Sequence, residues 1–140
     1  MAAVTAQTAD APRPRRARGA AESLGSIVLA FESVIVFLGG LAIFGLKALP
    51  EPIPPWWGIV AGTVVAVAMV LTARVLRYRW GIILGWVLQV IVALGGFFVP
   101  ALFFIALVFG GMWAYATIKG ASLDARNARL AAEADTANGD

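Results

Sequence analysis

The sequence predicts an all-α polytopic membrane protein, with four transmembrane helices in a compact bundle and both termini in the cytoplasm. Hydrophobic residues make up 61% of the 140 residues and charged residues only 14%, against roughly 25% charged residues in soluble domains. A chain this short has too little interior to bury so much apolar surface in water. It contains neither cysteine nor histidine, which excludes disulfide scaffolds, metal sites built on Cys or His, and His-dependent catalysis.

The chain begins with a basic segment. Residues 1–22 are rich in Ala, Pro and Arg, so we expect a flexible cytoplasmic tail. The apolar run over 24–46 has 23 residues, about 34 Å as a helix, which is long enough to span a membrane. It is too long for the hydrophobic region of a signal peptide, and no Ala-x-Ala cleavage site follows it.

Three more helices are predicted after the first. The prolines of 50–55 end the first helix, and Trp56 and Trp57 open a second one over 57–77. The apolar stretch over 80–118 has 39 residues, about 58 Å as one helix and almost twice the membrane thickness. We therefore expect a break at Gly95–Pro100 and two helices, 80–95 and 100–119, the alternative being one long kinked helix. Together these helices form a transmembrane domain over 23–120.

The C-terminal segment 121–140 is predicted to be a second flexible cytoplasmic tail. It is rich in Ala, has charges of both signs and offers no apolar face to bury. A short separate helix is an alternative, with Ser122 as its N-cap and Asp124 in its first turn.

The basic residues indicate the orientation. Ten of the eleven Lys and Arg residues fall on the side of the two tails and the turn after the second helix, and only Lys47 falls on the other side. This bias predicts a cytoplasmic position for both termini, in the plasma membrane. The arginines assigned to topology and to lipid headgroups are Arg13, Arg15, Arg16, Arg18, Arg74, Arg77 and Arg79.

Glu32 is the one acidic residue within a predicted span. It lies about 12 Å into the first helix, and Gln89 lies about 13.5 Å into the third helix from the same side. We expect the two side chains to meet, with the carboxyl protonated or sharing a proton with the amide. The alternatives are a pairing of Glu32 with Arg74 or Arg77, a proton or cation relay, and a contact with the membrane helix of a partner.

Small residues mark the faces on which these helices should pack closely. Gly25 and Gly39 flank Glu32 at intervals of seven residues, and Gly81 and Gly85 precede Gln89 at intervals of four. The other predicted packing motif is Gly58-x-x-x-Gly62 in the second helix, for which packing within the chain comes first and a homodimer contact second. Trp113 and Tyr115 are interpreted as interfacial belt residues near the end of the fourth helix.

These residues predict no catalytic activity, no bound metal and no cofactor. The other acidic residues fall in tails or a loop, and no phosphate-binding loop or metal-ligand cluster is present in the sequence. Although the pI is near 10, the basic residues lie next to apolar segments, which argues against nucleic acid as a partner. The expected partners are membrane lipid and either a second copy of the chain or another membrane protein.

Residues 24–120 resemble a family of small actinobacterial four-helix integral membrane proteins, catalogued as a domain of unknown function. The resemblance rests on Leu-Ala-Phe-Glu-Ser at 29–33, Gly-Trp-Val-Leu-Gln at 85–89 and Phe-Val-Pro-Ala-Leu-Phe at 98–103. It implies a plasma-membrane protein, genes often adjacent to those for folylpolyglutamate synthase, and no known activity. It also implies that Glu32 and Gln89 belong to the family pattern.

Two functions are consistent with these observations. The first is a non-catalytic accessory or scaffold protein that acts through helix–helix contacts. The alternative is a small oligomeric channel or proton-coupled transporter that uses Glu32.

Overall fold

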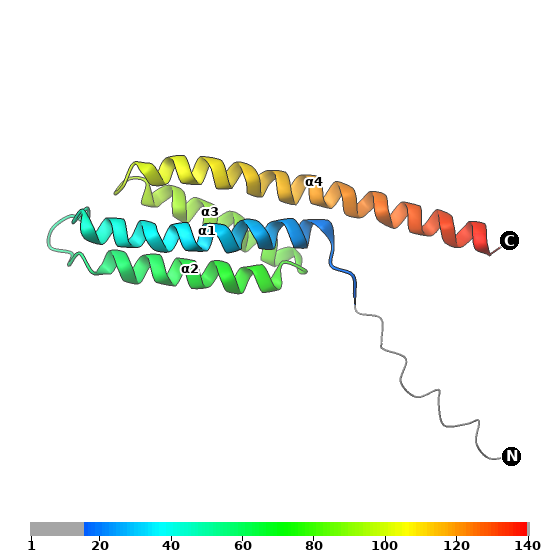
Figure 1. Cartoon of the computed structure of the whole chain (residues 1–140), viewed down its shortest axis with the longest axis horizontal. Helices are drawn as coiled ribbons and strands as arrows, with labels where there is room; N and C mark the ends of the chain where they lie inside the picture. Colours follow the sequence, from blue (N-terminus) through cyan, green and yellow to red (C-terminus); the bar gives the residue numbers. More distant parts are fainter. Residues whose placement is uncertain (1–15, 140) are drawn as a thin grey trace, which may run out of the picture.

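The computed structural model describes residues 16–139 and contains four α-helices in this range (Figure 1). They are α1 (Ala20–Gly45), α2 (Trp57–Val75), α3 (Arg79–Gly95) and α4 (Ala101–Asn138). No strand occurs among the described residues. The all-α prediction and the break between the third and fourth helices are therefore confirmed.

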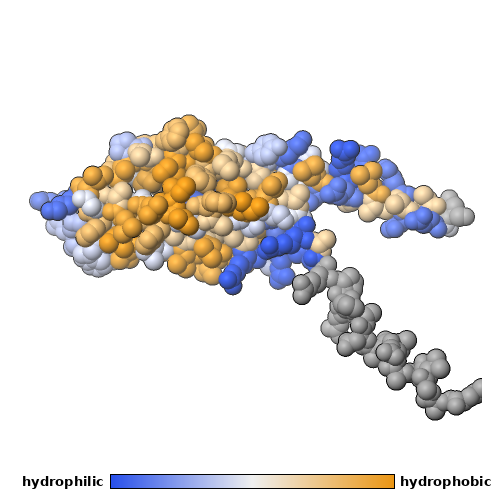
Figure 2. Space-filling model, in the orientation of Figure 1, coloured by the Kyte–Doolittle hydropathy of each residue, from blue (hydrophilic) through white to orange (hydrophobic). Residues whose placement is uncertain are grey.

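Three of the helices, α1, α2 and α4, are long and apolar enough to cross a membrane, whereas α3 has only 17 residues. Figure 2 shows apolar surface along the bundle, with hydrophilic residues concentrated toward its two ends. Many large side chains on this surface are more than half exposed, such as Phe31, Phe104 and Leu107. Contiguous apolar surface of this extent is stable in lipid rather than in water.

The four helices form a bundle in which α1 is the central element. It packs along both α2 and α4, and α4 packs along α3, whereas the contact between α2 and α3 is the smallest of these four. The bundle thus has two distinct ends, which we name by their contents. The terminal end holds the start of α1 and the turn between α2 and α3, and the loop end holds the connections 46–56 and 96–100 (Figure 1).

Local chemistry explains where α1 ends. The Lys47 N–H donates to the Phe44 carbonyl and the Ala48 N–H donates to the Ile43 carbonyl, which is the hydrogen-bond pattern of a Schellman motif. Lys47 has φ +50°, the left-handed conformation that this motif requires. Ala48 also packs against the apolar cluster that contains Ile43.

The C-terminal tail differs from the prediction. Instead of a frayed segment from residue 121, α4 continues without a break to Asn138 and projects beyond the bundle at the terminal end (Figure 1). Adding a residue to an existing helix avoids the cost of nucleation, so an Ala-rich segment that follows a span can stay helical. The predicted first tail, 1–22, lies largely outside the described residues, and α1 begins at Ala20, inside it.

Candidate functional site: a buried carboxyl–amide pair

Glu32 of α1 and Gln89 of α3 form a hydrogen bond inside the bundle. Gln89 Nε2 donates to Glu32 Oε2 at 2.5 Å. Glu32 is 0% exposed and Gln89 is 6% exposed. The structure therefore brings together the two polar residues that the sequence places at similar depth.

An apolar core surrounds this pair. Leu29 and Val36 lie one turn to either side of Glu32 on α1, and Leu88 and Val92 lie beside Gln89 on α3. All four belong to the main cluster of buried side chains. The pair is therefore buried in a part of the bundle where most neighbouring side chains along both helices are apolar.

Each partner of the pair keeps one oxygen without a donor. Glu32 Oε1 and Gln89 Oε1 are buried and have no hydrogen-bond partner among the described residues. An ionised carboxylate would leave both atoms as acceptors, whereas a neutral carboxyl can accept from an amide N–H and donate to an amide oxygen. The structure has one hydrogen bond between the two side chains and none at these two oxygens.

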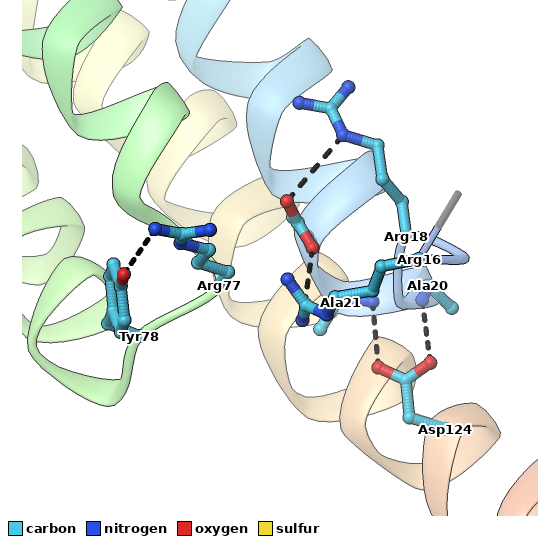
Figure 3. A network of polar contacts seen from close by, with 8 residues as sticks. Arg16, Arg18, Ala20, Ala21, Arg77, Tyr78 and Asp124 are labelled. Atoms are coloured by element: carbon cyan, nitrogen blue, oxygen red, sulfur yellow. Dashed lines mark hydrogen bonds and ion pairs between the residues drawn. The ribbon is translucent and has the colours of Figure 1, made fainter. Parts of the chain in front are cut away.

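Neither arginine that was considered as a partner for Glu32 reaches it. The Arg77 guanidinium donates to the Tyr78 hydroxyl and lies 4.4 Å from the centre of the Tyr78 ring, as Figure 3 shows. Arg74 and Arg79 are exposed. These three arginines lie at the terminal end of the bundle, where the sequence places them.

Glycines allow the helices around the pair to approach closely. A Cβ on Gly40 would lie 2.6 Å from the Gly58 carbonyl oxygen and 2.9 Å from the Gly62 Cα, so Gly58 and Gly62 form the α1–α2 contact. A Cβ on Gly39 would lie 2.8 Å from Leu102 Cδ2 of α4. The Gly58-x-x-x-Gly62 motif thus serves packing within the chain.

Trp113 is a buried core residue, so its assignment to the interfacial belt is wrong. Its side chain is 0% exposed. A Cβ on Gly25 of α1 would lie 3.2 Å from the indole ring, and a Cβ on Gly85 of α3 would overlap it. The two glycines create the space that this large ring fills, and Tyr115 remains exposed.

Gly81 has a different role from Gly85. A Cβ on Gly81 would collide with the Val75 carbonyl group at the end of α2, and the Gly81 N–H donates to the Tyr78 carbonyl. Gly81 therefore permits the tight turn between α2 and α3.

Asp124 contributes a contact that the sequence analysis missed. Its carboxylate lies beside the first turn of α1, where it accepts from the Ala20 N–H at 2.6 Å and from the Ala21 N–H at 3.2 Å (Figure 3). A carboxylate at a helix N-terminus accepts hydrogen bonds from free N–H groups and interacts favourably with the positive end of the helix dipole. Asp124, which lies in α4, thus caps α1 and does not stabilise the start of a separate C-terminal helix. The sequence gives no local signal of this contact, because Asp124 is 104 residues away from Ala20 along the chain.

Two arginines of the basic tail pair with Glu22 at the same end. Arg16 lies 3.7 Å and Arg18 lies 3.5 Å from the Glu22 carboxylate. The two arginine side chains are more than 60% exposed, whereas the Glu22 side chain is 10% exposed, so the arginines hold positive charge beside a largely buried carboxylate. Arg13 and Arg15, which carry the same prediction, lie outside the described residues.

The described chain contains no group of three or more His, Cys, Asp or Glu side chains that could hold a metal ion. Glu32 and Gln89 supply hydrogen-bonding atoms, and their geometry shows directly one hydrogen bond that joins α1 to α3.

Comparison with known proteins gives a family without a described activity. No match was found among curated proteins, and none was found among solved structures. A family model described as "Protein of unknown function (DUF4233)" matches residues 23–129. The match begins in the first turn of α1, includes Glu32 and Gln89, and ends in the part of α4 that projects from the bundle. Since it covers more than half of the chain, the protein belongs to the DUF4233 family.

Proposed function

We propose that this chain is a non-catalytic accessory protein of the plasma membrane that acts through contacts between helices. The observation that carries the proposal is the projecting part of α4, in which every residue from Ala125 to Asn138 is exposed. Because the segment continues α4, it is helical without packing of its own, and its whole surface is free for contact. A binding partner would bury part of that surface.

The family match supports a functional role for this segment. It continues to residue 129, beyond the last helix turn that contacts α1. The segment also contains Leu130, a large apolar side chain that is 53% exposed. In this proposal the partner is another membrane protein or a second copy of the chain.

The proposed topology has four spans and two cytoplasmic termini. Eight of the nine described Lys and Arg residues lie on the terminal side of the bundle, which favours a cytoplasmic position for that side. At 17 residues, α3 is about 25 Å long and spans a hydrocarbon core of about 30 Å only with local thinning of the bilayer. The resemblance to small actinobacterial membrane proteins supports the plasma membrane as the location.

Site-specific photo-crosslinking tests the accessory role. A photoreactive residue at position 130 in the full-length protein, activated in cells, should give one discrete adduct. The matched control is position 107, where Leu107 is 74% exposed on the apolar part of the same helix. No adduct at position 130, or the same adducts at both positions, would contradict the proposal.

The alternative function is a channel or proton-coupled transporter, which the two donor-free oxygens of Glu32 and Gln89 favour. A flux assay in proteoliposomes separates the two functions. The accessory role predicts that wild type and Glu32→Gln show the same background leak of protons. A proton flux that the wild type supports and Glu32→Gln loses would establish the transporter.

A further inference from the structure

The bundle contains an apolar groove between α2 and α3. These two helices are joined by a tight turn at the terminal end and contact each other less than α1 contacts α2 or α4, so a space of about 610 Å³ is left toward the loop end. Val36, Gly40 and Ile43 of α1 form its floor. Residues of α2 and α3 form its two walls, and Leu49, Ile53 and Phe98 line it from the two connections at the loop end.

The groove opens sideways, toward the apolar surroundings of the bundle. Trp57 on one wall is 48% exposed, and Ile91 and Leu94 on the other wall are 41% and 55% exposed. All of its lining residues are aliphatic, aromatic or glycine. A polar ligand would lose its hydrogen bonds with water on entering such a site.

The size of the groove limits what can occupy it. The volume falls within the range of about 300–1,000 Å³ that is usual for small-molecule sites. A ligand of that size can enter the groove, whereas a helix about 10 Å wide would lie across its open side.

The length of the groove also corresponds to one leaflet of a membrane. On α2 it extends from Trp57 to Val65, about 12 Å along the helix, and one half of the hydrocarbon core is about 15 Å thick. An empty groove would lose dispersion contacts along its lining. We propose that this groove binds one acyl chain of a membrane phospholipid.

Lys47 lies where the lipid headgroup would be. It is exposed in the connection between α1 and α2, between the lining residues Ile43 and Leu49. An acyl chain gains little from leaving other lipid chains for an apolar groove, so attraction between Lys47 and the phosphate adds to the affinity for a phospholipid held in this position. Glu51, also exposed in this connection, carries the opposite charge, so the position of Lys47 and not the net charge of the connection favours the phosphate. The proposal does not depend on the accessory role, because the projecting part of α4 lies at the opposite end of the bundle.

Photolabelling of the full-length protein tests the proposal. The protein is reconstituted in vesicles of phosphatidylcholine and phosphatidylglycerol that contain a trace of phosphatidylcholine with a diazirine on one acyl chain. We expect adducts to concentrate on peptides from the two groove walls. Labelling of all exposed apolar helix faces in proportion to their area would overturn the proposal.

Variants that fill the groove provide the control. Ala61→Phe fills it from α2 and Leu94→Phe narrows it from α3, and each should lose most of the wall adducts. Val64→Phe adds an aromatic ring to α2 at a residue that is 61% exposed and does not line the groove, so it should retain them. Unchanged wall labelling in a filling variant that keeps the wild-type helical circular dichroism would overturn the proposal, as would a dimer that shields both walls from the probe.

Discussion

Glu32 and Gln89 each have one buried oxygen without a donor, so their hydrogen bond offsets only part of the free energy that burying them costs. Removing one partner should lower the free energy of unfolding more than removing both. Gln89→Leu leaves the carboxyl buried with no donor, and we expect it to lower the free energy of unfolding by about 1–3 kcal/mol. Denaturant unfolding in detergent micelles, followed by Trp fluorescence, measures this loss.

The double variant Glu32→Leu/Gln89→Leu serves as the control for that prediction. Replacing both partners by apolar groups of similar size should restore much of the stability, since no polar group then stays buried. If the losses of unfolding free energy in the two single Leu variants add up to the loss in the double variant, the two side chains are not coupled. Glu32→Gln should remain close to wild type, because an amide pair can form the same hydrogen bond.

Gly85 and Gly111 offer a matched test of the packing around Trp113. A Cβ on Gly85 would overlap the indole ring, whereas a Cβ on Gly111 would meet nothing within 4 Å. We expect Gly85→Ala to cost about 1–3 kcal/mol from overpacking. Gly111→Ala should be neutral or stabilise the protein by up to about 1 kcal/mol, because Ala favours a helix over Gly.

The same unfolding measurement in micelles compares the two glycine variants. Equal effects would mean that the Trp113 ring does not occupy the space over Gly85. The position of Trp113 also shows why sequence reasoning failed there. A tryptophan near the end of a span is typical of the interfacial belt, and only the two glycines on other helices make room for it inside.

At the scale of elements, Asp124 joins the start of α1 to α4. The carboxylate accepts from two N–H groups of the first turn of α1, and loss of a helix cap costs about 0.5–2 kcal/mol. We expect Asp124→Ala to increase amide hydrogen exchange at Ala20 and Ala21, measured by mass spectrometry of the protein in micelles. Asp135→Ala, on the exposed part of the same helix, should leave exchange in α1 unchanged.

The bounds of the helices show what local sequence can determine. The start of α2 and the end of α3 agree with the prediction at residues 57 and 95, because prolines and glycines mark these positions. The early start of α1 at Ala20 and the helical course of α4 beyond residue 121 could not be found in this way. The start of α1 depends on its contact with α4, where a Cβ on Gly120 would collide with the Ala21 backbone, and the extension of α4 depends on its continuity with the preceding span.

Within the candidate site, depth and spacing were sufficient to pair Glu32 with Gln89. Both residues lie about eight or nine positions from the same side of the membrane, on helix faces that carry glycines. The groove between α2 and α3 had no such signal. It results from the angle at which two helices leave a turn, and its lining residues come from all four helices and both connections at the loop end.

At the scale of the whole molecule, the distribution of positive charge and the number of spans can be tested together. The chain has no cysteine, so single cysteines provide specific sites for labelling in intact cells. If α3 crosses the membrane, the two loop-end connections lie on the same side. Glu51→Cys and Phe97→Cys should then both react with a membrane-impermeant maleimide from outside, since both residues are exposed.

Tyr78→Cys and Thr136→Cys should react only after the membrane is permeabilised, because the terminal end has eight of the nine described basic residues. The reverse labelling pattern at all four positions would show that the protein has the opposite orientation in the membrane, with the same four spans. Protection of position 97 alone would mean that α3 enters the membrane without crossing it. Because the N-terminus of α4 would then lie within the bilayer, its free N–H groups would need partners that lipid cannot supply. We therefore expect positions 51 and 97 to react together.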